Sequence, residues 1–191
     1  MPGKAYHHPD LRTHLITVTR DLIETEGSDA VTLARVAKSC DVSVAAPYRH
    51  FAGKEALLGA VAGEGFTELR SALLSGASVA GHPRERLVAA GVAYVDYATE
   101  HPHLFRLMFS ADLRDRQTEV GTAAIAALAS LVDPLELRVP ADVAVRATWA
   151  LAHGLALLRI GGMLTFTRED SERRLRDELS ALLFGIEATD E

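Results

Sequence analysis

Hydrophobic residues recur along this chain three or four positions apart, and no sustained alternation of apolar and polar residues appears. The first spacing is that of helices with one apolar face, whereas alternation would indicate strands. Glycine and proline fall mostly between the periodic stretches, where they end one helix and precede the next. We therefore predict an all-α fold of about nine helices, at residues 10–26, 32–40, 43–51, 54–74, 83–100, 104–109, 115–132, 141–160 and 168–186.

The lengths of these helices divide the chain into a small head and a larger body. Three short helices come first, and the long helix at 54–74 leads from them into the rest of the chain. A chain of 191 residues is long enough for one domain or two small ones. We predict a head at residues 1–54 and a body at residues 55–191.

The segment at 33–51 has the layout of a helix-turn-helix motif. Asp41 stands where the chain must turn, in a left-handed backbone conformation that glycine usually supplies and aspartate tolerates. Ser43 is suited to cap the next helix. The helix before the turn has one apolar stripe, made of Leu33, Val36, Ala37 and Cys40. The pattern fits a DNA reader or a helical hairpin at the edge of a core.

The third predicted helix favours the DNA reader. It begins with small side chains, which allow a close approach to a major groove, and it ends in Tyr48, Arg49 and His50, which no core explains. Pro47 falls about one turn into this helix, where it removes at most one backbone hydrogen bond. We expect Pro47 to face inward, against the second helix.

Residues 31–58, VTLARVAKSCDVSVAAPYRHFAGKEALL, resemble the N-terminal DNA-binding domain of the tetracycline-repressor (TetR) family. The ending YRHF…KEAL is specific to it, while Asp41 replaces the common glycine, and Ala34 replaces a basic residue that some members direct to a base. That leaves Arg35 as a base or backbone contact. The resemblance implies phosphate contacts from Thr32, Ser43, Tyr48, His50 and Lys54, and groove contacts from Val44, Ala45, Ala46 and Arg49.

The charge distribution agrees with a DNA-binding head. The net charge is −6, which argues against a protein that is coated with nucleic acid. Residues 1–60 hold seven basic and seven acidic residues, whereas residues 61–191 hold 13 and 19. The head is therefore the less acidic end, where a polyanion can dock.

Two stretches of the body, HPHLFRLMF at 101–109 and TWALAHGLALLRIGG at 148–162, are similar to the C-terminal domain of one branch of the family. That branch is named for a Trp…His-Gly motif, which here is Trp149, His153 and Gly154. The resemblance implies an effector pocket, with Tyr94, Tyr97, Phe105, Met108, Phe109, Trp149 and His153 as its candidate residues. From the residues alone, Trp149 is more often a core side chain, and His153 is either a satisfied core histidine or a ligand donor.

The last predicted helix has an apolar stripe that needs a partner. The partner is the rest of the same chain or a second subunit. In the family, the last two helices form a two-fold, four-helix dimer interface, and a pair of heads reads two half-sites. The resemblance therefore implies a homodimer, with Leu155, Leu175, Leu179, Leu182, Leu183 and Ile186 as candidate interface residues.

Other classes of protein fit the sequence less well. The single cysteine, Cys40, excludes an internal disulfide framework and suggests a reducing cytoplasm. The most apolar run, at 147–164, contains His153 and Arg159 and is rather short for a membrane span, so we expect a buried helix. The run His101-Pro102-His103 lacks supporting metal ligands, so no metal or cofactor is expected.

No nucleophile, base and orienting group are spaced as in an enzyme. We therefore predict a cytoplasmic, homodimeric DNA-binding regulator, a repressor relieved by a small apolar or amphipathic effector that binds its C-terminal domain. The alternative is a helical small-molecule-binding protein that does not bind an operator.

Overall fold

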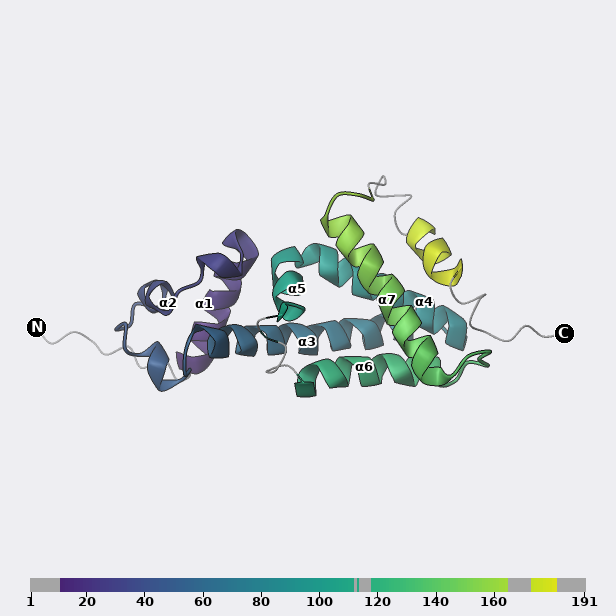
Figure 1. Ribbon diagram of the computed structural model, residues 1–191, viewed down its shortest axis with the longest axis horizontal. Coiled ribbons are helices and arrows are strands. Elements are labelled where there is room, and N and C mark those ends of the chain that lie inside the picture. Colours follow the sequence, from purple (N-terminus) through teal and green to yellow (C-terminus); the bar gives the residue numbers. More distant parts are fainter. Residues whose placement is uncertain (1–10, 112, 114–117, 165–172, 182–191) are drawn as a thin grey trace, which may run out of the picture. The chain divides into compact units, whose positions relative to one another are not determined.

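The computed structural model describes residues 11–111, 113, 118–164 and 173–181, and these residues contain helices and no β-strand (Figure 1). The elements are α1 (Leu11–Glu26), η1 (Ser28–Ala30), α2 (Leu33–Ser39), η2 (Pro47–Arg49), α3 (Lys54–Ser78), α4 (Pro83–Glu100), α5 (Pro102–Met108), α6 (Thr118–Val132) and α7 (Ala141–Ile160). Residues 173–181 are also helical. The all-α fold is as predicted.

The chain forms two compact units. The first comprises the described residues of Met1–Gly65 and His103–Gln117, and the second those of Phe66–Pro102 and Thr118–Glu191. Helix α3 contributes residues to both units. The units therefore do not coincide with the predicted head and body, since residues after 102 that were assigned to the body belong to the same unit as the head.

The core of the first unit follows the predicted apolar stripes. Leu33, Val36, Ala37 and Cys40 of the second predicted helix are all buried, as are Leu15 and Ile23 of α1 and Leu57 of α3. Burying one such aliphatic side chain stabilises the fold by about 1.5–3 kcal/mol. The small side chain of Ala37, with an exposed fraction of 0%, lets neighbouring elements approach α2 closely.

Helix α5 completes this unit through a close contact with α3. A Cβ atom built on Gly65 would lie 2.7 Å from the Sδ atom of Met108 and 3.3 Å from the Cγ atom of Leu104. Leu104, Phe105 and Met108 are fully buried. A larger residue at Gly65 would therefore require the side chain of Met108 to shift.

Helices α4, α6 and α7 pack on one another in the second unit. Gly76 of α3 lies against α4, because a Cβ atom there would be 2.8 Å from that of Ala93. The helical segment at 173–181 also packs on α4: a Cβ atom on Gly91 would be 2.8 Å from a methyl carbon of Leu179. Two glycines thus mark the closest helix contacts of this unit.

Helix α7 is not the buried helix that its composition predicts. It has the length and hydropathy of a membrane-spanning helix, yet only 28% of its most apolar window is buried. One face, with Ala144, Thr148, Ala152, Leu155 and Ala156, packs inside the protomer. Most of the opposite face is apolar, and the described residues leave it uncovered.

Most predicted boundaries lie close to the observed ones. The helices at 83–100 and 141–160 have the predicted bounds. Helix α3 runs to Ser78 instead of residue 74, because Gly76 is held inside it against α4. Parts of the first, seventh and last predicted helices lie outside the described residues.

The prediction of an α-helix at 43–51 is wrong. Residues 44–46 form a turn, and Pro47–Arg49 form the short 3₁₀-helix η2. The reason is Pro47, which has no N–H to donate to the carbonyl of Ser43 and whose ring crowds that carbonyl. The carbonyl of Ser43 instead accepts from the N–H of Ala46, at 2.9 Å.

The turn after α2 has the geometry that the sequence predicts. Asp41 has a φ of 53°, in the left-handed region. The N–H of Asp41 donates to the carbonyl of Lys38 (3.2 Å), and the N–H of Val42 donates to the carbonyl of Ala37 (3.0 Å). This pair of bonds is the Schellman motif. Helix α7 ends in the same motif, but there Gly162, with a φ of 69°, occupies the left-handed position.

We predict that Asp41→Val destabilises the protein by about 1–2 kcal/mol, because a β-branched side chain is disfavoured in the left-handed conformation. Asp41→Asn is the matched control, and we expect a change within about 0.5 kcal/mol for it. Urea unfolding at constant pH measures both free energies. Equal stabilities of the valine and asparagine variants would contradict the assignment of strain to this residue.

Candidate nucleic-acid interface

The N-terminus of α2 is capped by Thr32, a residue that the sequence assigns to a DNA contact. The hydroxyl oxygen of Thr32 accepts from the backbone N–H of Arg35, at 3.1 Å, and so caps the helix. The hydroxyl hydrogen of this exposed residue remains suited to a phosphate oxygen. Thr32 therefore has a structural role that is compatible with its predicted contact.

Arg35 forms a two-point ion pair with Glu26 of α1. One guanidinium nitrogen lies 3.0 Å from a carboxylate oxygen, and the other nitrogen contacts the second oxygen. The hydrogen bond to Arg35 lowers the pKa of Glu26, and the same bond raises the pKa of Arg35. The sequence analysis missed Glu26, because nothing in its spacing marks it as a partner.

Most of the residues between Ser43 and His50 that are predicted to contact DNA lie on the surface. Val44 is 58% exposed and Tyr48 60% exposed, which is unusual for side chains of their size. Ser43, Ala45, Arg49 and His50 are exposed as well, and Ala46 is half-buried. The outer surface of this segment, residues 43–50, is called the reading surface below.

Two inward side chains hold the reading surface in place. Pro47 is buried, as predicted, and η2 packs against α2. Phe51 is also buried, and the guanidinium carbon of Arg12 lies 5.3 Å from the centre of its ring. The N–H of Phe51 donates to the carbonyl of Pro47, at 2.9 Å. These anchors leave Tyr48, Arg49 and His50 pointing outward between them.

Lys54 begins α3 directly after the reading surface. It is half-buried, beside an open hollow of about 290 Å³ that residues 52–56 line. The first N–H groups of a helix have no partners within it, and the helix dipole favours an anion there. Lys54 and this helix start together form a site suited to a phosphate group, as the resemblance implies.

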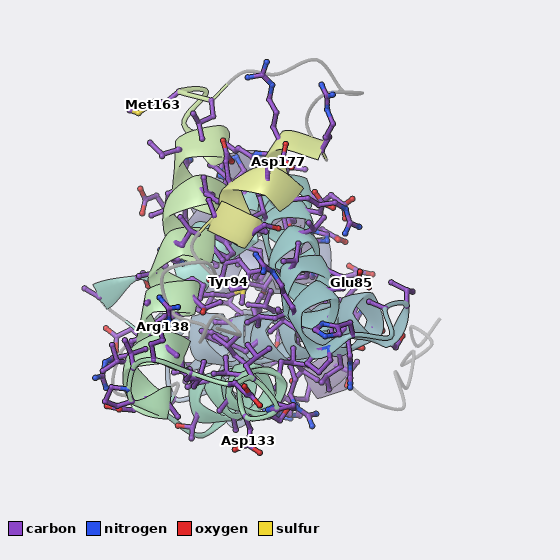
Figure 2. All side chains as sticks on the ribbon, turned by 90° about the vertical axis from the view of Figure 1, so that its right-hand side faces the viewer. Glu85, Tyr94, Asp133, Arg138, Met163 and Asp177 are labelled. Carbon is purple, nitrogen blue, oxygen red and sulfur yellow. The ribbon has the colours of Figure 1, made fainter. Side chains whose placement is uncertain are left out.

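In the second unit, three of the predicted effector residues form one hydrogen-bonded group. The hydroxyl of Tyr94 lies 2.8 Å from Nδ1 of His153, and Nε1 of Trp149 donates to the same hydroxyl at 3.3 Å. Tyr94 comes from α4 and the other two from α7, and Figure 2 shows Tyr94 between these helices. Tyr94 is buried, whereas Trp149 and His153 are half-buried. We call these three residues the body cluster.

The chemistry of these three side chains determines which atom donates each hydrogen bond. An indole N–H only donates, so the oxygen of Tyr94 accepts from Trp149. Burial raises the pKa of Tyr94 and lowers the pKa of His153, so both are neutral at neutral pH. The arrangement that uses the Tyr94 hydroxyl hydrogen has Nδ1 of His153 as its acceptor, which leaves the proton of the imidazole on Nε2. The body cluster thus places a neutral imidazole beside the buried hydroxyl of Tyr94.

The other predicted effector residues are placed differently. Tyr97 is buried in the second unit, and its hydroxyl donates to Glu68, at 3.3 Å. Phe105, Met108 and Phe109 belong to the first unit, where the rings of Phe105 and Phe109 have centroids 4.9 Å apart. Among the described residues, hydrogen bonds therefore join Tyr94, Trp149 and His153 into one group.

The candidate dimer residues pack inside the protomer where they are described. Leu155, Leu175 and Leu179 are 8%, 0% and 5% exposed, and Leu182, Leu183 and Ile186 lie outside the described residues. The apolar residues of the open face of α7, called the α7 stripe below, are instead Val143, Ala147, Ala150, Gly154, Leu157 and Leu158, and the exposed ion pair of Asp142 and Arg146 lies beside them at the start of the helix. These positions follow the helical period, so the sequence contained this signal. No other described atom lies within 4 Å of a Cβ atom built on Gly154.

We predict that Tyr94→Phe destabilises the protein by about 1–2 kcal/mol, because the indole N–H and the imidazole nitrogen both lose a buried partner. Tyr48→Phe removes the same atom from a ring that is 60% exposed, so it serves as the control and should change stability by less than about 0.5 kcal/mol. Thermal and urea unfolding measure both. Equal losses in the two variants would show that the body cluster contributes no hydrogen-bond energy.

Comparisons with known proteins agree with the two-part organisation of the chain. No curated protein sequence matches the chain. A structure of a protein with unknown function from Rhodococcus sp. RHA1 is 29% identical, with a TM-score of 0.82, and the match covers 97% of this chain and 100% of that one. A TetR-family transcriptional regulator from Streptomyces coelicolor is 25% identical, with a TM-score of 0.71 and coverage of 91% and 80%.

A third structure, a TetR family transcription regulator from Marinobacter aquaeolei VT8, is 18% identical with a TM-score of 0.66 and covers 93% of this chain and 96% of its own, which shows a shared fold. Residues 15–61 match the family of bacterial regulatory proteins called tetR, and residues 87–182 match the tetracyclin repressor-like C-terminal domain. These matches include the reading surface and the body cluster. The chain therefore belongs to the TetR family of DNA-binding transcription regulators.

Proposed function

We propose that this protein is a cytoplasmic homodimeric repressor that leaves its operator when a small apolar or amphipathic molecule binds the C-terminal part. The observation that carries the proposal is the reading surface, where Val44 and Tyr48 are held outward on buried anchors. Exposed apolar groups that are rimmed by polar and basic residues fit a partner surface. The polar neighbours Arg49, His50 and Lys54 make a nucleic acid the partner of matching chemistry.

Contacts of two kinds support this mode of binding. Tyr48, His50, Thr32 and Lys54 carry donors of the kind that fix a protein on phosphates, and these contacts act at every sequence. Val44, Ala45 and Arg49 provide the apolar and long polar groups that distinguish bases in a major groove. The reading surface is only a few residues long, so one head reads few base pairs.

A second subunit would double this short reading surface, and the α7 stripe supports such an arrangement. The stripe combines small residues at its centre, Ala150 and Gly154, with Leu157, which is 44% exposed, and Val143, which is 40% exposed. Small residues allow two helices to approach closely, and an apolar face of this length is costly in water. A two-fold pair buries the same stripe on both subunits.

The body cluster supports the effector half of the proposal. Its imidazole, at His153, is half-buried among apolar residues of α4 and α7. Apolar surroundings with a few polar groups suit a small, largely apolar molecule. Binding there would release the operator by favouring a protomer arrangement in which the two heads no longer match successive grooves. Coupling energies of this kind are typically about 1–3 kcal/mol.

The effector half is tested separately from DNA binding. Fluorescence anisotropy of an operator duplex follows release while neutral acyl, aromatic and terpenoid compounds are added one at a time. We expect a compound that releases the wild-type protein to act much less on His153→Phe, which keeps an aromatic ring and lacks the donor. Release of both proteins by the same compound at the same concentration would exclude the body cluster as its site.

For DNA binding, we predict that Tyr48→Ala weakens binding by about tenfold on specific and unrelated duplexes alike, because a phosphate contact carries no sequence information. Val79→Ala, at a side chain that is 81% exposed in the second unit, should leave binding unchanged. Anisotropy titrations at fixed salt give both affinities. An unchanged affinity of Tyr48→Ala would remove Tyr48 from the interface.

For the dimer, we predict that Gly154→Ala weakens self-association by about tenfold, because an added methyl group separates two closely packed helices. Within one protomer the same change meets no other described atom, and alanine favours a helix, so a monomer should become more stable. Gly121→Ala, which is also open in the protomer, is the control. Sedimentation equilibrium measures the association. Unchanged association of Gly154→Ala would contradict an interface centred on the α7 stripe.

A further inference from the structure

Several threonine hydroxyls of this protein find a partner within their own helix. The hydroxyls of Thr17, Thr19, Thr25 and Thr99 each donate to the backbone carbonyl four residues earlier, at distances from 2.7 to 3.1 Å. A helix always offers this carbonyl, so a threonine can be satisfied without any other element. Thr19 shows that the bond also serves in the interior: it is fully buried in α1 and bonds the carbonyl of Leu15 at 2.7 Å.

Thr148 of α7 departs from this pattern. Apart from Cys40 and the tyrosines, Thr19 and Thr148 are the polar residues that the described part of the chain buries, and they are 0% and 5% exposed. The hydroxyl oxygen of Thr148 has no hydrogen-bond partner among the described residues, and so it does not bond the carbonyl of Ala144. A buried hydroxyl without a partner costs free energy, which the fold of Thr19 avoids and that of Thr148 does not.

The surroundings of Thr148 are apolar and uncharged. It shares the inner face of α7 with Ala144 and Ala152, one helical turn to either side, and α7 packs on α4 and α6. The buried side chains of α4 and α6 are aliphatic, except those of Tyr94 and Tyr97. None of the described acidic or basic residues is buried. The unpaired hydroxyl therefore lies on a face of small apolar side chains, where a charged molecule would find no opposite charge.

We infer that Thr148 is a ligand-binding residue, whose hydroxyl donates to the oxygen of a neutral carbonyl compound held at the inner face of α7. This inference rests on the proposed effector binding and adds to it one contact and one class of ligand. A ketone oxygen only accepts, and a threonine hydroxyl can donate to it. The bond would remove the cost of the unpaired hydroxyl, while the hydrocarbon part of the ligand would lie among aliphatic side chains.

The first test needs no ligand. Thr148→Val and Thr19→Val each replace a buried hydroxyl by a methyl group of similar size, so they form a matched pair. We expect Thr19→Val to unfold at a lower urea concentration than the wild type, because its bond to Leu15 is lost. Thr148→Val should unfold at the same or a higher urea concentration. A loss in Thr148→Val as large as that in Thr19→Val would overturn the inference, because the hydroxyl would then have a partner in the free protein.

The second test uses three neutral ketones, cyclohexanone, camphor and menthone, and hydrocarbons with the same carbon skeletons. Depletion of the vapour above a solution of the full chain measures the binding of each compound. We expect Thr148→Val to bind the best of the ketones about threefold to tenfold more weakly than the wild type, as for one lost hydrogen bond, and the matching hydrocarbon equally well. Thr148→Ser keeps the hydroxyl and should keep the affinity for the ketone.

The outcomes separate this inference from the proposed function. A wild-type protein that binds none of the three ketones, or a Thr148→Val variant that binds them as the wild type does, would overturn the inference and leave DNA binding untouched. Ketone binding that depends on Thr148 but leaves the affinity for an operator duplex unchanged would support the contact, and it would overturn the proposed release of the operator.

Discussion

The packing of Pro47 and Phe51 into the head determines what the rest of the reading surface can do. Both side chains are buried, and a 2.9 Å hydrogen bond joins the N–H of Phe51 to the carbonyl of Pro47. With these two points fixed, the intervening polar side chains have only one direction left, away from the interior. The left-handed Asp41 fixes the other end, because it sets the angle at which the chain leaves α2. The outward display of Val44 and Tyr48 follows from these constraints.

In the second unit, the two faces of α7 have different surroundings. The inner face of α7 consists of small residues and Leu155, which pack within the protomer, while the α7 stripe remains open. The body cluster lies between these faces and joins α7 to α4 through the hydroxyl of Tyr94. In the proposed mechanism, a ligand that changed the hydrogen bonds of His153 would act on the same helix that would present the stripe to a second subunit. Ligand binding and assembly would then share one structural element.

The sequence was sufficient where local chemistry decides the structure. The helical period placed most of the helices, and the need for a left-handed residue singled out Asp41. The sequence was insufficient at Pro47, whose missing N–H outweighs the helical preference of its neighbours. Pro47 was expected to remove one hydrogen bond within an α-helix, but residues 47–49 form a 3₁₀-helix instead. Glu26 was missed because its partnership with Arg35 depends on the crossing of α1 and α2. The composition of α7 predicted burial, and only the fold shows that the described residues leave one of its faces uncovered.

The account depends on the reading surface lying against a DNA duplex, and hydrogen exchange of backbone amides tests this most directly. The exchange rates of the dimer are compared with and without a selected duplex, at a salt concentration that permits full occupancy. The account predicts slower exchange in residues 43–51, at the starts of α2 and α3, and no direct protection on the outer face of α6. Unchanged exchange in residues 43–51 on a fully bound duplex, or protection confined to the second unit, would contradict it.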